Sequence, residues 1–272
     1  MDATDATGGD HSLGGHTSRW PIVAAAGAAA LYVGAGLAMA AGEMLPRTPP
    51  LVVAAVGAVV LVGGLAGWAR EAFFPDSSGV TPAASDDRER LYVGGMWLFL
   101  LSDLATFAAG FVYYAFIRSG TWPPSDLPPL LGSLVLVNTL LLVTSSGTIH
   151  LAHGALEGGD RRRFVGLLGA TVALGVAFLI GQAFEYYEFI TAESFTLSDG
   201  VFASAFYGLT GLHGLHVALG VVMLAVLFSR ALRGGYVDGG DTSVRTVSLY
   251  WHFVDGVWLF LVAVLYVGAV VG

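Results

Sequence analysis

The sequence predicts an all-α, polytopic membrane protein with seven transmembrane helices. Hydrophobic residues make up 55% of the 272 positions, and the mean hydropathy is +0.72. Charged residues make up only 12%, whereas a soluble domain carries about a quarter. Seven separate stretches also reach the length of about 20 apolar residues that a helix needs to cross the hydrocarbon core.

The apolar stretches follow a polar segment, residues 1–20, which reads as a tail. The longest break between them, residues 70–90, is charged and contains Pro and Ser, so it is predicted to be a connector. It divides the chain into a two-helix part, 21–69, and a five-helix part, 91–272. The expected spans are roughly 21–41, 51–69, 91–117, 130–151, 164–187, 201–228 and 248–271.

Arginine placement orients these helices. The tail and the second, fourth and sixth loops hold 10 of the 12 arginines, and the first and third loops hold only Arg47 and Arg118. Short cytoplasmic loops carry the excess of positive charge. We therefore expect a multi-pass protein of the cell membrane with its N-terminus in the cytoplasm and its C-terminus outside.

Two missing residue types narrow the function. Because the sequence has no cysteine, disulfides, thiolate metal sites and thioether-linked haem are excluded. Because all 12 positive charges are arginine and the net charge is −8, a retinal Schiff base on lysine is excluded. An acidic, lysine-free chain also argues against nucleic acid as a partner.

Ionisable residues inside the spans are the candidate functional residues, since each costs several kcal/mol in lipid unless it is neutralised or paired. Either they ligate a metal or haem, or they form a buried polar network whose members hydrogen-bond to one another across helices. No H-E-x-x-H pattern or other added ligand is present, which favours the network and predicts no metal. Its expected members are Asp103, His213, His216, His252, Asp255 and Glu185.

Asp103 lies near mid-bilayer, because it stands about 18 Å from the start of its span at ~1.5 Å per residue. We expect its carboxyl group to be largely protonated and hydrogen-bonded, for example to a histidine of 201–228. Two roles remain open. The group either takes up and releases protons or only ties two helices together.

Lipid and protein contacts are expected at two further places. Trp68, Arg70 and Glu71 at one helix end, and Arg230 at another, are candidate phospholipid ligands, because guanidinium groups at headgroup depth bind phosphate. The alternative is that these arginines only set topology. The small residues of "GLTGLHGLHVALG", 208–220, favour close approach of a helix from a larger partner subunit.

Six segments follow one another in a recognisable order: "WARE", "FLLSDLATFAAGFVYYAF", "AHGALEGGDRRRF", "GQAFEYYEF", "FTLSDGVFASAFYGLTGLHGLHVALG" and "YWHFVDGVWLFLVAVLYVG". This series resembles subunit III of the haem–copper cytochrome c and quinol oxidases. The resemblance covers roughly residues 51–272. Where that family usually has glutamate in the third span, this sequence has Asp103, which is one methylene shorter.

The resemblance implies a subunit without redox centres, in which a two-helix arm is separated from a five-helix bundle by a cleft that holds phospholipid. Haem and copper are then expected in subunit I, with subunit II as a further partner. The implied role is to support proton uptake and stability of the catalytic subunit. An equivalent subunit of a quinol oxidase or nitric oxide reductase, a stand-alone proton-coupled transporter and a haem-binding membrane enzyme are the alternatives.

Overall fold

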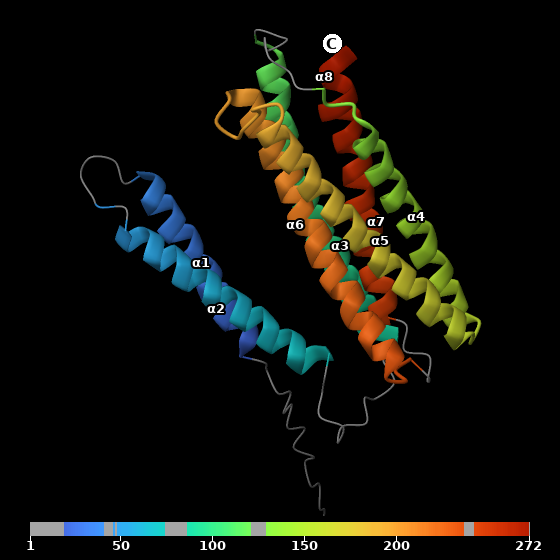
Figure 1. The fold of residues 1–272 in the computed structure, drawn as a ribbon. Helices are drawn as coiled ribbons and strands as arrows, with labels where there is room; N and C mark the ends of the chain where they lie inside the picture. The colour runs from blue at the N-terminus through green and yellow to red at the C-terminus, as the bar shows by residue number, and fades with distance from the viewer. Residues whose placement is uncertain are drawn as a thin grey trace, which may run out of the picture. The chain divides into compact units, whose positions relative to one another are not determined.

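The structure, a computed structural model, describes residues 19–40, 46, 48–73, 86–120, 129–236 and 242–271. Residues 1–18 of the predicted tail, Arg47 and the middle of the predicted connector lie outside these ranges. Every element in the described ranges is a helix (Figure 1). The helices are α1 (Trp20–Ala40), α2 (Thr48–Phe73), α3 (Asp86–Arg118), α4 (Ser133–Glu157), α5 (Arg161–Thr191), α6 (Val201–Leu232), α7 (Thr242–Leu261), the π-helix η1 (Val262–Val267) and α8 (Gly268–Val271).

The all-α polytopic fold is confirmed. Within the described ranges, six helices are long and apolar enough to cross a membrane, and the last of these spans, Thr242–Val270, runs through α7, η1 and α8. The apolar part of α1, Ile22–Ala38, is shorter and lies at the lower limit of about 17 residues for a crossing helix. That α1 also spans the membrane stays a prediction.

The helices extend beyond their apolar cores. Both ends of the connector predicted over 70–90 are helical, because α2 continues to Phe73 and α3 begins at Asp86. Likewise α7 begins at Thr242, six residues before the apolar stretch predicted to start at 248, and Val244 and Val247 in that first part are buried. Hydropathy therefore locates the crossing segments, and buried residues such as Val244 accompany the extension of α7 before its apolar stretch.

The chain divides into two compact units, Met1–Thr81 and Pro82–Gly272. In the first unit, α1 and α2 touch through glycines spaced seven apart, Gly27 and Gly34 on α1 and Gly57 and Gly64 on α2. A Cβ atom added at any of these four would overlap the backbone of the facing helix. Small residues at such a seam let two backbones come into direct contact.

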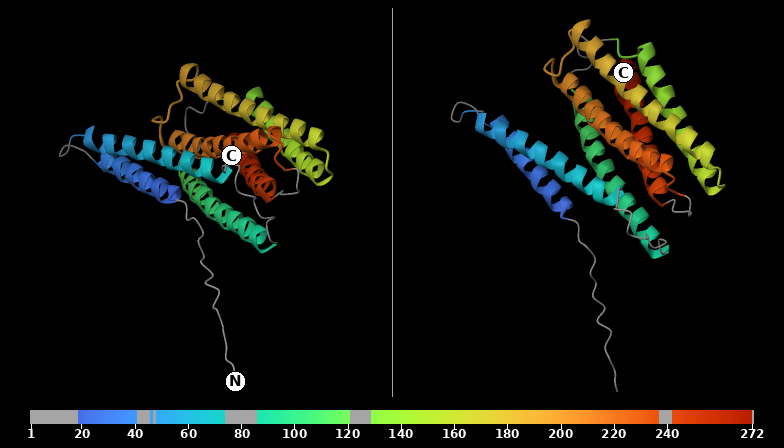
Figure 2. Two further views of the ribbon diagram at one scale, coloured as in Figure 1. Left: turned by 90° about the horizontal axis from the view of Figure 1, so that it is seen from below. Right: turned by 60° about the horizontal axis from the view of Figure 1, so that its bottom comes forward.

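In the second unit, α7 packs against α3, α4 and α6, and α5 packs against α4 and α6. Figure 2 shows α4 and α5 running side by side in both views. Trp251 of α7 fills the centre, where it is fully buried. Glycines make room for its ring, because an added Cβ would lie 2.8 Å from Trp251 Cη2 at Gly175 and 2.7 Å from its Cε3 at Gly220.

The junctions between helices are held by local capping. Asp160 accepts a hydrogen bond from the backbone N–H of Arg163 at 3.0 Å and so caps the start of α5. Arg161 donates to the carbonyl oxygen of Ala231 at 2.9 Å, near the end of α6, where unpaired carbonyls remain. Arg161 of the 161–163 triplet therefore holds the end of α6, in addition to any effect of its charge on topology.

Candidate functional site

Asp103 and His216 face each other between α3 and α6. Asp103 Oδ2 lies 3.4 Å from His216 Nε2, within ion-pair distance but longer than a well-formed hydrogen bond. Both side chains are largely buried, with 14% and 16% of their surfaces exposed respectively. Asp103 stands near the middle of the span Tyr92–Arg118. The structure thus brings together the mid-span carboxyl group and one histidine of the 201–228 segment.

The second ring nitrogen fixes the tautomer of His216. His216 Nδ1 lies 2.8 Å from the backbone oxygen of Leu212, which can only accept a hydrogen bond. Nδ1 therefore carries a hydrogen, and Nε2 either presents a lone pair to Asp103 or carries an added proton. α7 supports this arrangement, because the Tyr250 hydroxyl donates to the backbone oxygen of His216 at 2.9 Å.

His213, one turn away, does not join this pair. Its ring stacks on Trp258 with centroids 5.2 Å apart and planes 24° apart, and Phe178 meets it edge-on at 5.9 Å. Neither of its ring nitrogens has a hydrogen-bond partner among the described residues. His213 is therefore packed as an aromatic ring in the core, separate from Asp103.

His252 and Asp255 form a second cluster with Ser146 of α4. The Ser146 hydroxyl donates to Asp255 Oδ2, and its oxygen lies 3.0 Å from His252 Nδ1. Asp255 is buried and His252 is exposed. Ser146 was not among the residues predicted for the polar network. A serine in the middle of an apolar span was the available signal, but its partner depends on how α4 and α7 are rotated against each other.

Glu185 forms a third cluster, which is fully enclosed. Glu185 Oε2 accepts hydrogen bonds from Gln182 Nε2 at 2.8 Å and from the Tyr266 hydroxyl at 3.0 Å. All three side chains are buried. Tyr266 is a member that the sequence analysis missed. The expected polar residues therefore fall into three local clusters plus the isolated His213, and each cluster ties two helices of the second unit together.

The sequence left open whether these histidines ligate a metal or haem or form a polar network. The described residues contain no group of three or more His, Cys, Asp or Glu side chains that could hold a metal ion. His216 is held between Leu212 and Asp103, and His252 is bonded to Ser146. His213 is enclosed by aromatic rings.

The candidate lipid residues lie in different units. Trp68 and Arg70 are exposed near the end of α2, and the side chain of Glu71 lies outside the described part of the structure. The guanidinium carbon of Arg230 lies 5.2 Å from the ring centroid of Tyr236. This distance is within the range of a cation–π contact.

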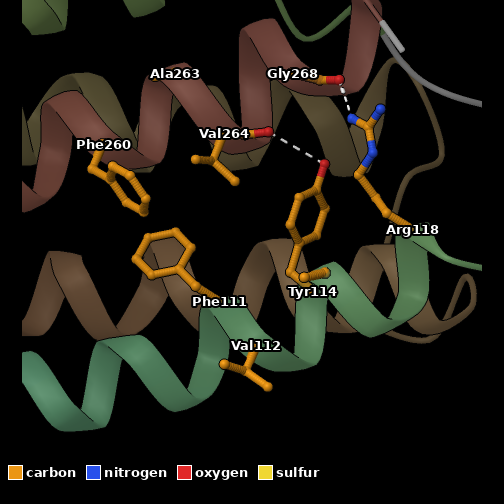
Figure 3. A pocket seen from close by; sticks show the side chains of 9 residues that line it. Phe111, Val112, Tyr114, Arg118, Phe260, Ala263, Val264 and Gly268 are labelled. Atoms are coloured by element: carbon orange, nitrogen blue, oxygen red, sulfur yellow. Dashed lines mark hydrogen bonds between the residues drawn. The ribbon is translucent and has the colours of Figure 1, made fainter.

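An open groove of about 590 Å³ lies between α3 and the last turns of the chain (Figure 3). Its walls are mainly apolar, with Phe111 and Phe260 edge-to-face at 4.6 Å. At one end, the Tyr114 hydroxyl donates to the backbone oxygen of Val264 at 3.3 Å, and Arg118 donates to that of Gly268. α3 thus supplies donors to carbonyl groups in and beside η1.

Comparison with known proteins agrees with this fold and these segments. Residues 15–270 match the family model described as cytochrome c oxidase subunit III. The chain is 42% identical over 182 residues to cytochrome c oxidase subunit 3 of Sus scrofa and to that of Felis catus, and 41% identical to that of Bos taurus. Each alignment covers 63% of this chain and 67% of the relative. The chain therefore belongs to the cytochrome c oxidase subunit III family.

Proposed function

We propose that this chain supports proton uptake by the catalytic subunit of a haem–copper terminal oxidase, and that Asp103 and His216 carry this role. Haem and copper would belong to subunit I, with subunit II as the other core partner. The observation that carries the proposal is the 3.4 Å approach of Asp103 Oδ2 to His216 Nε2 at mid-span. An intramembrane acid facing a base is the arrangement expected of a proton relay.

The fixed tautomer of His216 gives the pair two arrangements that differ in the position of one proton. In one, a protonated Asp103 donates to the lone pair of His216 Nε2. In the other, the carboxylate faces an imidazolium, and both ring nitrogens donate. Neither arrangement needs the Leu212 contact to break. A proton can therefore pass from the Asp103 carboxyl group to His216 Nε2 and back without repacking the helices.

The test uses the assembled oxidase with Asp103→Asn and Asp103→Leu. The asparagine amide can still donate to His216 Nε2, so we expect Asp103→Asn to assemble and to lose less than about 1 kcal/mol of stability. It cannot titrate, so proton uptake should slow and activity should be lost sooner during turnover. Asp103→Leu should show both defects and a further loss of about 1–3 kcal/mol of stability, because His216 Nε2 is left without a polar neighbour. The measurements are proton uptake, turnover lifetime and thermal midpoint.

The assembled Asp103→Asn oxidase could instead keep wild-type proton uptake and turnover lifetime from acidic to alkaline pH. That result would contradict the proton role, and Asp103 would then only hold α3 and α6 together. Failure of the wild-type chain to purify with a haem-containing subunit would instead contradict the placement in an oxidase. The two results are independent.

We further propose that phospholipid phosphate binds at two separate places, at Arg230 in the second unit and at Trp68, Arg70 and Glu71 near the end of α2 in the first unit. Arg230→Ala should weaken lipid retention about tenfold or more, because charge-assisted hydrogen bonds to phosphate are lost. Native mass spectrometry of the purified chain measures the retained lipid. Arg162→Ala removes the same charge from an exposed site at the start of α5 and serves as the control, since equal loss in both variants would indicate a general charge effect.

The proposed orientation places the N-terminus in the cytoplasm and the C-terminus outside, as supported by the arginine distribution. The cytoplasmic side would then hold residues 1–20 and the connector 70–90. A single cysteine in either segment, in a sequence with no other cysteine, should be alkylated by an impermeant maleimide only after the cells are opened. Labelling of intact cells would reverse the orientation.

A further inference from the structure

Three buried side chains of the second unit have polar atoms without a protein partner. Asn138 of α4, Gln182 of α5 and His213 of α6 are 1%, 5% and 1% exposed respectively. Among the described residues, both amide atoms of Asn138, Gln182 Oε1 and both ring nitrogens of His213 lack a hydrogen-bond partner. All three residues lie inside membrane spans, where hydrocarbon cannot supply a hydrogen bond. Buried polar side chains are nearly always bonded to protein or to ordered water, so a ligand is expected at these atoms.

Trp258 of α7 connects two of these side chains. Its indole ring stacks on His213 with centroids 5.2 Å apart. Its Nε1 donates to Thr139 Oγ1 at 3.1 Å, and Thr139 follows Asn138 in the sequence. His213 of α6 and Asn138 of α4 are therefore brought close to the same indole from two different helices.

Gln182 follows the residue that Asn138 contacts. A Cβ atom added at Gly181 would overlap Asn138 Oδ1, so the asparagine amide fills the space that a side chain at position 181 would take. The Nε2 atom of Gln182 donates to Glu185 Oε2 at 2.8 Å, which leaves the other end of its amide without a partner. Exchanging the oxygen and nitrogen of either amide would not pair these groups, because one end of Gln182 and both ends of Asn138 would still be left over.

The mixture of donors and acceptors identifies the ligand. The carbonyl oxygens of Asn138 and Gln182 accept hydrogen bonds, Asn138 Nδ2 donates them, and an uncharged imidazole such as that of His213 has one N–H and one lone pair. A cation would satisfy only the acceptors, and an anion would satisfy only the donors. Water both donates and accepts, and a buried water molecule typically makes about three hydrogen bonds.

We infer that ordered water binds between α4, α5 and α6 beside Trp258, where it bridges Asn138, Gln182 and His213. Through Gln182, this water joins the isolated His213 to the third polar cluster, so that one network crosses the three helices. The inference does not rest on the proposed function.

X-ray radiolytic footprinting of the full-length chain in detergent tests the site, because hydroxyl radicals form from bound water in place and oxidise the side chains beside it. Trp258 and Trp251 are a matched pair. Both are fully buried, with 1% and 0% exposed, and both indole N–H groups are bonded to a hydroxyl. Oxidation of Trp258 should be about tenfold faster than that of Trp251, since only Trp258 stacks on an imidazole at the water site.

The combined variant Asn138→Leu/His213→Phe removes four of the unpaired atoms and keeps side chains of similar size, with a phenyl ring that can stack on Trp258. It should lower the oxidation of Trp258 about fivefold or more, towards the rate of Trp251. Thr148→Val is the control, because it removes from α4 a hydroxyl that is bonded elsewhere, and it should leave the oxidation of Trp258 unchanged.

Equal oxidation of Trp258 and Trp251 in the wild-type chain overturns the inference, because the three side chains would then find their partners without water. Fast oxidation of Trp258 that the combined variant does not reduce also overturns it, since the radicals would come from bulk solvent. The wild-type ratio decides by itself if the combined variant does not fold.

Discussion

Trp251→Ala is expected to destabilise the second unit by about 3–5 kcal/mol, the usual range for removing a fully buried large aromatic side chain. The ring lies against Gly175 and Gly220, and neither glycine has a side chain that could fill the cavity. The indole N–H also donates to Ser145 Oγ at 2.9 Å, and the substitution leaves that buried hydroxyl without its donor.

The measurement is SDS-induced or thermal unfolding of the detergent-solubilised chain, followed by helicity. Trp97→Ala is the matched control, because Trp97 is 58% exposed and its loss should change the free energy of unfolding by less than about 0.5 kcal/mol. Equal effects of the two substitutions would show that Trp251 is not the centre of the core.

Gly57→Leu is expected to separate α1 from α2 at a cost of about 3 kcal/mol or more, at the upper end for overpacking. A Cβ at this position would overlap the backbone at Leu31. Because the obstacle is backbone, no side-chain rotation can relieve the overlap. Hydrogen exchange of residues 20–40 and 48–73, measured by mass spectrometry, should accelerate in both helices, while α4 and α5 in the other unit keep their rates.

Gly63→Leu is the control for this prediction. Gly63 lies on the same helix, and an added Cβ there meets nothing within 4 Å. It should leave exchange unchanged or slow it slightly, since leucine has a higher helix propensity than glycine. If Gly57→Leu exchanged no faster than Gly63→Leu, the glycine contact would not hold the two helices together.

Hydropathy was sufficient to predict the helices, because a segment that crosses the hydrocarbon core needs a continuous run of apolar residues. It was not sufficient for side-chain pairing, which depends on how each helix is rotated. His213 and His216 are three positions apart and therefore about 60° apart around the helix. That difference separates a ring stacked on Trp258 from a ring that faces Asp103. No pattern within one span indicates which histidine turns towards α3.

The missed residues share the same cause. Ser146 and Tyr266 each complete a cluster whose charged member was predicted, Asp255 and Glu185 respectively. Their partners are 109 and 81 positions away, so only the assembled helices bring them together. The glycine seam of α1 and α2, in contrast, has a signal within each helix, because its members recur seven residues apart on both.

The π-helix η1 affects how this chain can vary in length. The Gly268 N–H bonds to Ala263 O, five residues back, so the turn holds one residue more than an α-helical turn. If one residue is lost there, the segment can return to α-helical winding, so that the residues before it and after it keep their rotation about the helix axis. The same loss between Asp255 and Trp258 would rotate the following residues by about 100° and turn Trp258 out of the core. A one-residue deletion in a homologous sequence is therefore better aligned within Val262–Val267 than within the preceding turns.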